Sequence, residues 1–216
     1  MTVHSFINQA AKGAGMARQL DDEKKQRILE SAFEAFGERG LANTTIKDIA
    51  SHAGVAAGTV YTYFATKEEV FRAAVDAGWN RFHDDMAEML ETDEPFEVRI
   101  NNLIDYGFDL LTRVHPILRG MFSDANRMDL LTHHVDVLCT GMERFFEQGR
   151  RSGVLVGSPN PRVRRFFLNS VVSGILLNIS VAPPERLHDE VESIKTAVQE
   201  MMRESLVARA VAEGRS

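Results

Sequence analysis

The sequence predicts an all-α protein of about nine helices, with an N-terminal helix-turn-helix domain and a C-terminal helical domain. Apolar residues recur at spacings of three and four along most of the 216-residue chain, which is the period of a helix with one buried face. Proline and glycine clusters, such as those at 157–161 and 183–184, separate these periodic segments. We identify no segment that alternates like a strand and no internal repeat, so helices are expected throughout.

The limits of each helix in the first domain are predicted from residues that typically start or end a helix. Residues 1–20 lack periodicity, and we expect a disordered extension; Lys12 and Arg18 leave open an arm that follows a DNA groove. The acids at 21–23 suit the start of a first helix, which Gly40 ends. Two short helices then complete a domain at residues 21–66.

The second domain, residues 67–216, begins with a long helix. Thr66 caps it, and it runs to about Leu90, a length of ~36 Å. Because it starts beside the short helices and ends in the second domain, we expect it to carry displacements between the two. Five further helices are expected at about 96–114, 117–122, 130–152, 162–181 and 185–212.

The two short helices form a helix-turn-helix pattern. In the first, apolar residues stand at i, i+3, i+4 and i+7 from Ile46 to Ala53, and Thr45 with Asp48 forms a capping box. Gly54 occupies the turn, where a residue that tolerates positive φ is needed. In the second helix, Val60 and Phe64 point inward.

The remaining side chains of the second short helix favour a nucleic-acid partner. They are small, hydroxylated or aromatic: Ala57, Gly58, Thr59, Tyr61, Thr62 and Tyr63. Small residues allow a close approach, and hydroxyls donate to phosphates or base edges. The alternative is a helical hairpin with an ordinary solvated face.

From about Gln26 to Val75, roughly a quarter of the chain, the sequence resembles the DNA-binding domain of the TetR (tetracycline-repressor) family of bacterial regulators. The matching features are Ala-Phe-Gly-Glu-Arg-Gly at 35–40, Thr-Thr-Ile-x-x-Ile-Ala-x-x-Ala-Gly-Val at 44–55, Gly-Thr-Val-Tyr-x-Tyr-Phe at 58–64 and Lys-Glu-Glu-Val at 67–70. One position departs, because Ala56 stands where the family usually has a Ser that caps the recognition helix. A side-chain cap typically contributes ~1 kcal/mol.

The resemblance implies roles for individual residues. By their match to the family motif, six residues are expected to contact DNA phosphates: Thr45, Lys47, Thr59, Tyr61, Tyr63 and Lys67. Three others lie nearest the bases: Ala57, Gly58 and Thr62. The Thr62 methyl or Ala57 can meet a thymine methyl in the major groove.

Composition is consistent with an intracellular regulator. The net charge is −6, but residues 1–67 hold eight Lys and Arg against seven Asp and Glu, so the acidic excess lies in the remainder. The single Cys139 excludes an intramolecular disulfide and favours a cytoplasmic location. No apolar run approaches the ~20 residues of a membrane-spanning helix, and residues 1–15 do not resemble a signal peptide.

The second domain contains a bulky, methionine-rich set of residues. Core packing explains each one singly, but unbranched Met suits surfaces that accept varied apolar molecules. The resemblance implies a small effector bound among helices four to eight. The candidate contacts are Phe82, Met86, Met89, Phe108, Leu111, His115, Met121, Phe122, Met142, Phe145 and Ser170. His133 and His134 are adjacent and diverge by ~100° on a helix, so we expect no metal site.

The eighth and ninth helices favour a homodimer. Ser170 and Gly174 stand at i, i+4 on a helix that is apolar over much of its circumference, which suits burial on two sides. The alternative is that both helices only cover their own domain. The candidate interface residues are Phe167, Ser170, Val171, Gly174, Asn178, Ile194, Val198 and Met201.

Together these features predict a dimeric DNA-binding transcriptional regulator that is not an enzyme and needs no cofactor. We find no phosphate-binding glycine loop, no metal-ligand spacing and no nucleophile motif. The expected partners are a near-palindromic DNA operator, a second copy of the chain and an effector of unknown identity, without a membrane. We expect a repressor that an apolar or amphipathic effector releases; the alternative is a helix-turn-helix protein without an effector.

Overall fold

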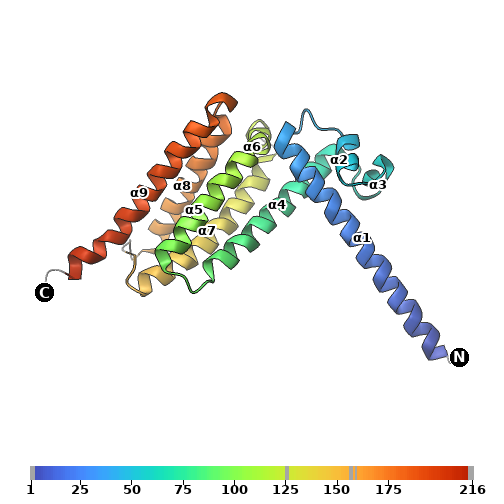
Figure 1. Ribbon diagram of the computed structural model, residues 1–216, viewed down its shortest axis with the longest axis horizontal. Coiled ribbons are helices and arrows are strands. Elements are labelled where there is room, and N and C mark those ends of the chain that lie inside the picture. The colour runs from blue at the N-terminus through green and yellow to red at the C-terminus, as the bar shows by residue number, and fades with distance from the viewer. Residues whose placement is uncertain (1–2, 125–126, 156–157, 159, 214–216) are drawn as a thin grey trace. The chain divides into compact units, whose positions relative to one another are not determined.

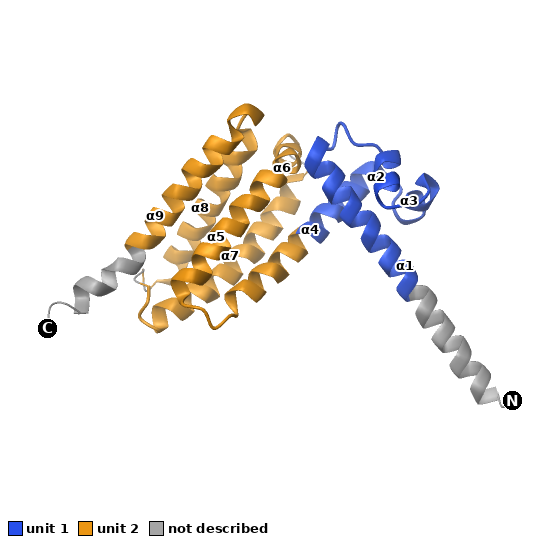
Figure 2. Ribbon diagram, in the orientation of Figure 1, with its two compact units in different colours: residues 1–78 blue, residues 79–216 orange. Residues whose placement is uncertain are grey.

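The computed structural model describes residues 3–124, 127–155, 158 and 160–213, with side chains described for 19–124, 127–155, 158 and 160–204. Every element in these residues is helical (Figure 1). The chain divides into two compact units, Met1–Gly78 and Trp79–Ser216 (Figure 2). The all-α prediction is therefore confirmed.

Unit 1 contains α1 (Val3–Arg39), α2 (Ile46–His52), α3 (Ala57–Tyr63) and the first half of α4 (Lys67–Leu90). Its core joins all four helices. The fully buried side chains include Ile28 and Phe36 of α1, Ile49 of α2, Val60 of α3, and Val70 and Phe71 of α4. The rings of Phe36 and Phe71 meet edge to face with centroids 5.2 Å apart, which fixes the base of α4 against α1.

Two boundaries differ from those expected. Helix α1 begins at Val3, not near Asp21. The sequence before Asp21 contains no proline and many strong helix formers, so a helix anchored in the core can propagate back through it. The boundary between the units lies within α4 and not before it, because residues 70–75 of α4 pack into the core of unit 1.

Unit 2 contains the rest of α4 with α5 (Phe96–Arg113), α6 (His115–Phe122), α7 (Met128–Arg151), α8 (Pro161–Val181), the short helix η2 (Pro184–Arg186) and α9 (Leu187–Glu213). These limits lie within two residues of those expected, except that the ninth segment starts as a separate 3₁₀ turn at its proline. Helix α5 packs on α9, and α8 packs on α6 and α7.

Helices α5 and α7 approach each other closely at one end. A Cβ atom added to Gly149 would lie 2.6 Å from the Phe96 ring, so only glycine fits there without displacement. The Phe96 and Phe145 rings stack with centroids 4.4 Å apart. The guanidinium of Arg99 lies over Phe145 and donates to the carbonyl of Leu90, the last residue of α4.

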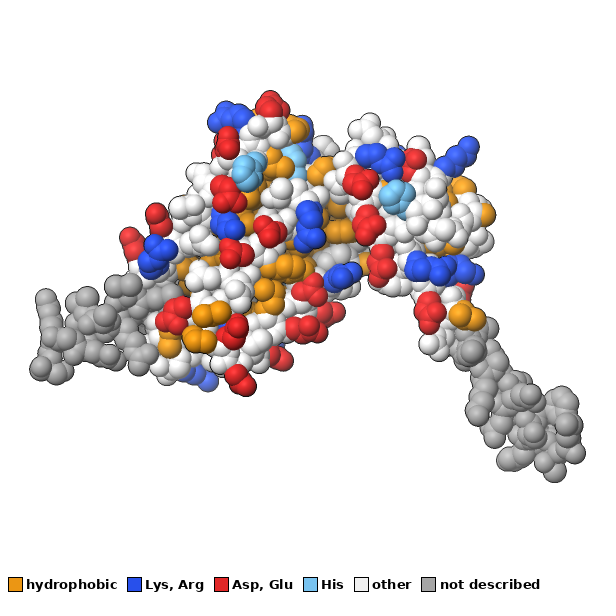
Figure 3. Space-filling model, in the orientation of Figure 1, with side chains coloured by type: hydrophobic (Ala, Val, Ile, Leu, Met, Phe, Trp, Pro, Cys, Tyr) orange, Lys and Arg blue, Asp and Glu red, His pale blue; other side chains and the backbone are white. Residues whose placement is uncertain are grey.

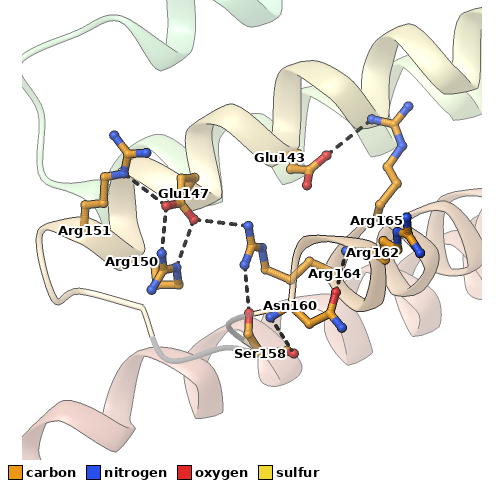
Figure 4. A network of polar contacts seen from close by, with 9 residues as sticks. All are labelled: Glu143, Glu147, Arg150, Arg151, Ser158, Asn160, Arg162, Arg164 and Arg165. Atoms are coloured by element: carbon orange, nitrogen blue, oxygen red, sulfur yellow. Dashed lines mark hydrogen bonds and ion pairs between the residues drawn. The ribbon is translucent and has the colours of Figure 1, made fainter.

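Arginines hold the corner between α7 and α8 (Figure 4). Glu147 of α7 accepts from Arg150 and Arg151 of its own helix and pairs at 3.2 Å with Arg164 of α8. The hydrogen bonds from Arg150 and Arg151 lower the pKa of Glu147 to about 2. Farther along, Arg165 pairs with Asp136 and Glu143. These ion pairs fix the direction in which α8 leaves the corner.

Candidate DNA-binding and effector sites

The turn between α2 and α3 has the expected caps. The side chain of Thr45 accepts a hydrogen bond from the Asp48 N–H at 3.2 Å, and the Asp48 carboxylate accepts from the Thr45 N–H at 2.8 Å. The Thr45 hydroxyl also donates to the Asp48 carboxylate at 2.6 Å, and this bond, together with the one from the Thr45 N–H, lowers the pKa of Asp48. Gly54 has a φ of 65°, the left-handed conformation expected of it. The predicted capping box and turn are confirmed.

Helix α3 presents the expected outer face. Val60 and Phe64 are buried, whereas Tyr61, Gly58 and Thr62 are exposed. The Tyr61 ring is 57% exposed, and its hydroxyl makes no hydrogen bond within the described part of the chain. Ala56 supplies no side-chain cap to the helix, as its residue type predicts. The candidate residues Ala57, Thr59 and Tyr63 are half-buried.

Two of the expected phosphate donors already have protein partners. The Tyr63 hydroxyl donates to the Asp21 carboxylate of α1, and this bond raises the pKa of Tyr63. The Lys67 ammonium donates to the carbonyls of Leu41, at 2.8 Å, and Thr44, at 3.0 Å. Lys67 therefore ties the first turn of α4 to the segment before α2, and one of its three ammonium hydrogens remains.

The other candidates around α3 are open to solvent. Thr45 and Lys47 are exposed on α2. The Thr62 hydroxyl donates to the Thr59 carbonyl at 2.6 Å, so its hydrogen is used within the helix. Acidic and basic side chains are interspersed over the visible face of both units (Figure 3). We therefore expect any DNA-facing positive charge to come from single residues such as Lys47, which is exposed.

The expected effector contacts are mostly buried in unit 2, but they do not meet at one place. The buried ones are Phe82, Met86, Phe108, His115, Met121 and Phe145, and Met89, Leu111, Phe122 and Met142 are half-buried. Phe145 stacks on Phe96, which lies twelve residues, or ~18 Å, before Phe108 along α5. His115 is beyond the far end of α5 and contacts the Ala182 carbonyl at 3.1 Å. The set thus extends along the helices of the unit.

Ser170 stands apart from the other effector candidates. It is exposed on α8, and its hydroxyl donates to the Phe166 carbonyl at 2.8 Å. It lies with the candidate dimer residues and not with the buried set.

A polar aromatic cluster in unit 2 escaped the sequence prediction. Trp79 of α4 stacks on His134 of α7, with centroids 5.2 Å apart, and the rings of His83 and His134 lie 5.8 Å apart. Phe82 stacks on Tyr106 of α5. Burial, reinforced by the bond that its hydroxyl donates to Asp85, raises the pKa of Tyr106 to about 12. Burial, with the neighbouring His134, lowers the pKa of His83.

The only sequence indication of this cluster is the i, i+4 spacing of Trp79 and His83 on α4. Its partners come from two distant helices, so spacing along the chain could not identify them.

One face of α8 exposes large apolar side chains. Phe167 is 56% and Phe166 76% exposed, and Val163, Leu177 and Val181 continue the same face. Four of these five are not among the candidate interface residues, although they lie on the same side of α8 as Phe167. A Cβ atom added to Gly174 would meet nothing within 4 Å. Asn178 is exposed beside it, and Val171, Ile194, Val198 and Met201 are half-buried.

Within the described residues, no group of three His, Cys, Asp or Glu side chains could hold a metal ion. Cys139 is buried, and burial raises the pKa of its thiol, as suits a core residue. None of the described helices is by itself long and apolar enough to span a membrane. Helix α8 and the segment Pro184–Glu204 are long and apolar enough only when they are taken together, and the chain bends by 119° between them.

Comparison with known proteins places this chain among helix-turn-helix regulators. Residues 28–74 match the family described as bacterial regulatory proteins, tetR family. An uncharacterized HTH-type transcriptional regulator of Bacillus subtilis, YfiR, is 26% identical over 76% of this chain and 83% of its own length. The HTH-type transcriptional repressor KstR2 of Mycobacterium tuberculosis is 34% identical over 50% of this chain and 54% of its own length.

A solved structure has the same fold. It is the transcriptional regulator FadR of Bacillus subtilis in complex with stearoyl-CoA, with a TM-score of 0.59 and 18% identity over 82% of this chain and 96% of that chain. Several other curated relatives match over about half of their length or less. The family match thus lies at residues 28–74, and the likeness in fold extends over 82% of this chain.

Proposed function

Because this chain belongs to the TetR family of DNA-binding transcriptional regulators, we propose that it is a dimeric repressor of its own operator. A small apolar or amphipathic effector would release it from a near-palindromic site. Two helix-turn-helix units on one face of DNA need major grooves about one turn, or ~34–36 Å, apart. The operator symmetry then mirrors the two-fold symmetry of the dimer.

The outer face of α3 is the observation that supports the DNA-binding part of this proposal. It combines small residues with an exposed phenol whose hydroxyl has no partner in the described part of the chain. We propose that Ala57, Gly58 and Thr62 lie nearest the bases. Tyr61, with Thr45, Lys47, Thr59, Tyr63 and Lys67, would contact phosphates.

Fluorescence anisotropy with DNA from the region upstream of the gene tests these roles. Tyr61→Phe removes one phosphate donor, so binding to operator and unrelated DNA should weaken alike, by about ten-fold. Thr62→Ala should instead change the order of preference among operator variants. Tyr106→Phe, the same chemical change in unit 2, is the matched control and should leave DNA binding unchanged. If Tyr61→Phe binds like the wild type, the proposed face of α3 is wrong.

Lys67 needs a separate test because it bonds to the protein itself. Lys67→Ala removes both the proposed phosphate contact and the bonds to two backbone carbonyls. A loss of DNA binding therefore counts as evidence for phosphate contact only if the variant unfolds at the wild-type temperature.

The exposed stripe on α8 supports the proposed dimer. Five large apolar side chains at helical spacing lie open on one chain, and contiguous exposed apolar surface commonly marks a protein interface. Gly174 and Ser170 lie within the stripe, where small residues allow a second helix to approach. Ile194, Val198 and Met201 of α9 would complete the interface.

The effector half of the proposal is supported by α4, one continuous helix that contributes residues to both units. Phe82 and Met86 on its second half are buried in unit 2. An effector that contacts them can bias the position of α4 only by binding one state better than the other. A hundred-fold release requires about 2.7 kcal/mol of such preference. The stearoyl-CoA bound to FadR supports the amphipathic class.

A thermal-shift screen of lipophilic compounds would identify the effector, because a ligand that binds only the folded state raises its stability. With such a compound, Met86→Ala or Phe122→Ala should reduce release from the operator and leave DNA binding by the ligand-free protein largely intact. Leu103→Ala, at a residue of α5 that is as buried as Met86 and lies outside the candidate set, controls for lost stability. Variants that keep effector affinity but lose DNA binding would contradict the proposed coupling.

A further inference from the structure

The hydroxyl of Tyr63 has two possible acceptors, the Asp21 carboxylate of its own chain and a DNA phosphate. In the structure it donates to Asp21, a residue of α1 that is 42 positions away in the chain. A phenol hydroxyl carries one hydrogen and can donate it to one strong acceptor at a time. A DNA phosphate at Tyr63 must therefore take that hydrogen from a carboxylate.

The charges around this bond oppose a phosphate. Asp21 makes no ion pair with a Lys or Arg of the described residues; its one interaction there is with Tyr63. Asp22 and Glu23 follow it as further exposed acids. Lys25, four residues after Asp21 in α1, has its ammonium over the Phe64 ring at 5.8 Å. Among the described residues, no ion pair thus neutralises the acidic end of this bond.

We propose that Asp21 competes intramolecularly with the DNA phosphate for Tyr63 and thereby lowers the affinity of the protein for all DNA sequences. The inference rests on the proposed phosphate contact of Tyr63. Asp21 acts through Tyr63, so it is a positioning residue that need not touch DNA. Its physical effect has two parts: it holds the donor hydrogen, and it places a negative charge beside an incoming phosphate.

The size of the effect follows from the distance between the two anions. If a phosphate oxygen takes the hydroxyl hydrogen while the Asp21 carboxylate stays beside the same hydroxyl, the two anions lie ~4 Å apart. The repulsion of two unit charges at that distance in water corresponds to about a five-fold change in a binding constant. Asp21→Asn removes the charge and keeps a carbonyl acceptor. We therefore expect it to bind operator and unrelated DNA at least about five-fold more tightly at low salt. The gain should shrink as salt screens the charges.

The experiment compares variants by fluorescence anisotropy at two salt concentrations. Asp22→Asn is the matched control: it makes the same charge change one residue away, without a bond to Tyr63, and should give a smaller gain. Asp21→Asn should also gain less when Tyr63 is already replaced by Phe, because no donor is then left to release. A circular dichroism melt confirms that each variant folds.

The alternative outcomes separate the two proposals. If Tyr63→Phe alone binds DNA like the wild type, the phosphate contact of Tyr63 itself is wrong. If Tyr63→Phe weakens binding and Asp21→Asn does not tighten it, the competition is refuted and Asp21 is a clamp that holds the ring. A clamp would also make Asp21→Ala weaker than Asp21→Asn, whereas competition requires both to bind more tightly than the wild type.

Discussion

A single side-chain oxygen distinguishes the starts of α2 and α3. Thr45 accepts from the Asp48 N–H at the start of α2, but Ala56 has no atom that can do the same for α3. The backbone of Ala56, at φ −73° and ψ 146°, already has the extended conformation of a capping residue. Ala56→Ser should therefore stabilise unit 1 by about 1 kcal/mol, which raises the melting temperature by roughly 2–4 °C.

Differential scanning fluorimetry measures this change, with Ala56→Val as the control that adds volume without an acceptor. A valine variant that stabilises equally would show that the gain does not come from a cap. The same serine would preorganise the recognition helix, so it should not weaken operator binding.

At the scale of elements, the proposed dimer depends on α8. Gly174 lies within its exposed apolar stripe, and a Cβ atom there would meet nothing within the single chain. The Cβ of the leucine in Gly174→Leu therefore meets no atom of the chain's own packing, and leucine improves the helix propensity of α8, but its side chain would keep a second helix away. We expect a folded monomer in light scattering at micromolar concentration, with greatly reduced operator affinity.

Gly107→Leu on α5 is the matched substitution, because a Cβ atom at Gly107 also meets nothing within 4 Å. It should remain dimeric. A wild-type protein that is monomeric at micromolar concentration would refute the proposed interface, and a dimeric Gly174→Leu variant would move it to another face.

For the molecule as a whole, folding is linked to protons through two histidines of unit 2. Burial is the main cause that lowers the pKa of His83 and of His115 below the usual 6.5. The folded chain then binds fewer protons than the unfolded chain just below pH 6.5. Stability is therefore full above that pH and falls as the solution is acidified, by at most about 1.4 kcal/mol per pH unit for each histidine.

Urea unfolding at pH 7.5, 6.5 and 5.5 measures this slope. His83→Phe keeps a ring beside Trp79 and cannot be protonated, so its stability should fall less steeply on acidification; the part from His115 remains. His133→Phe changes an exposed ring and serves as the control. Equal slopes in His83→Phe and the wild type would exclude His83 as a source of the pH dependence.

The lowered pKa of Glu147 acts in a separate, more acidic range. Its folded-state pKa of about 2 lies below the usual 4.5, so its contribution is present above about pH 4.5. That contribution falls progressively as the pH drops from about 4.5 to about 2.

The sequence by itself determined the local structure of this protein. The capping box at Thr45 and Asp48, the turn at Gly54 and the uncapped start at Ala56 depend on residues within four positions of each other. Helix periodicity likewise placed Val60 and Phe64 inward and set most helix limits, because a helix repeats its environment every three or four residues. The start of α1 was an exception. The helix is anchored in the core after Asp21 and continues back through residues that have no periodic apolar face.

Only the tertiary structure decided which distant groups meet. Tyr63 bonds to Asp21, Lys67 bonds to Leu41 and Thr44, and Trp79 stacks on His134; each pair comes from different elements, whose crossing is set by packing. The tertiary structure also separated the apolar residues of α8 into a buried side and an exposed stripe. Periodicity could not do so, because burial in the chain's own core and burial against a second copy demand the same apolar side chains.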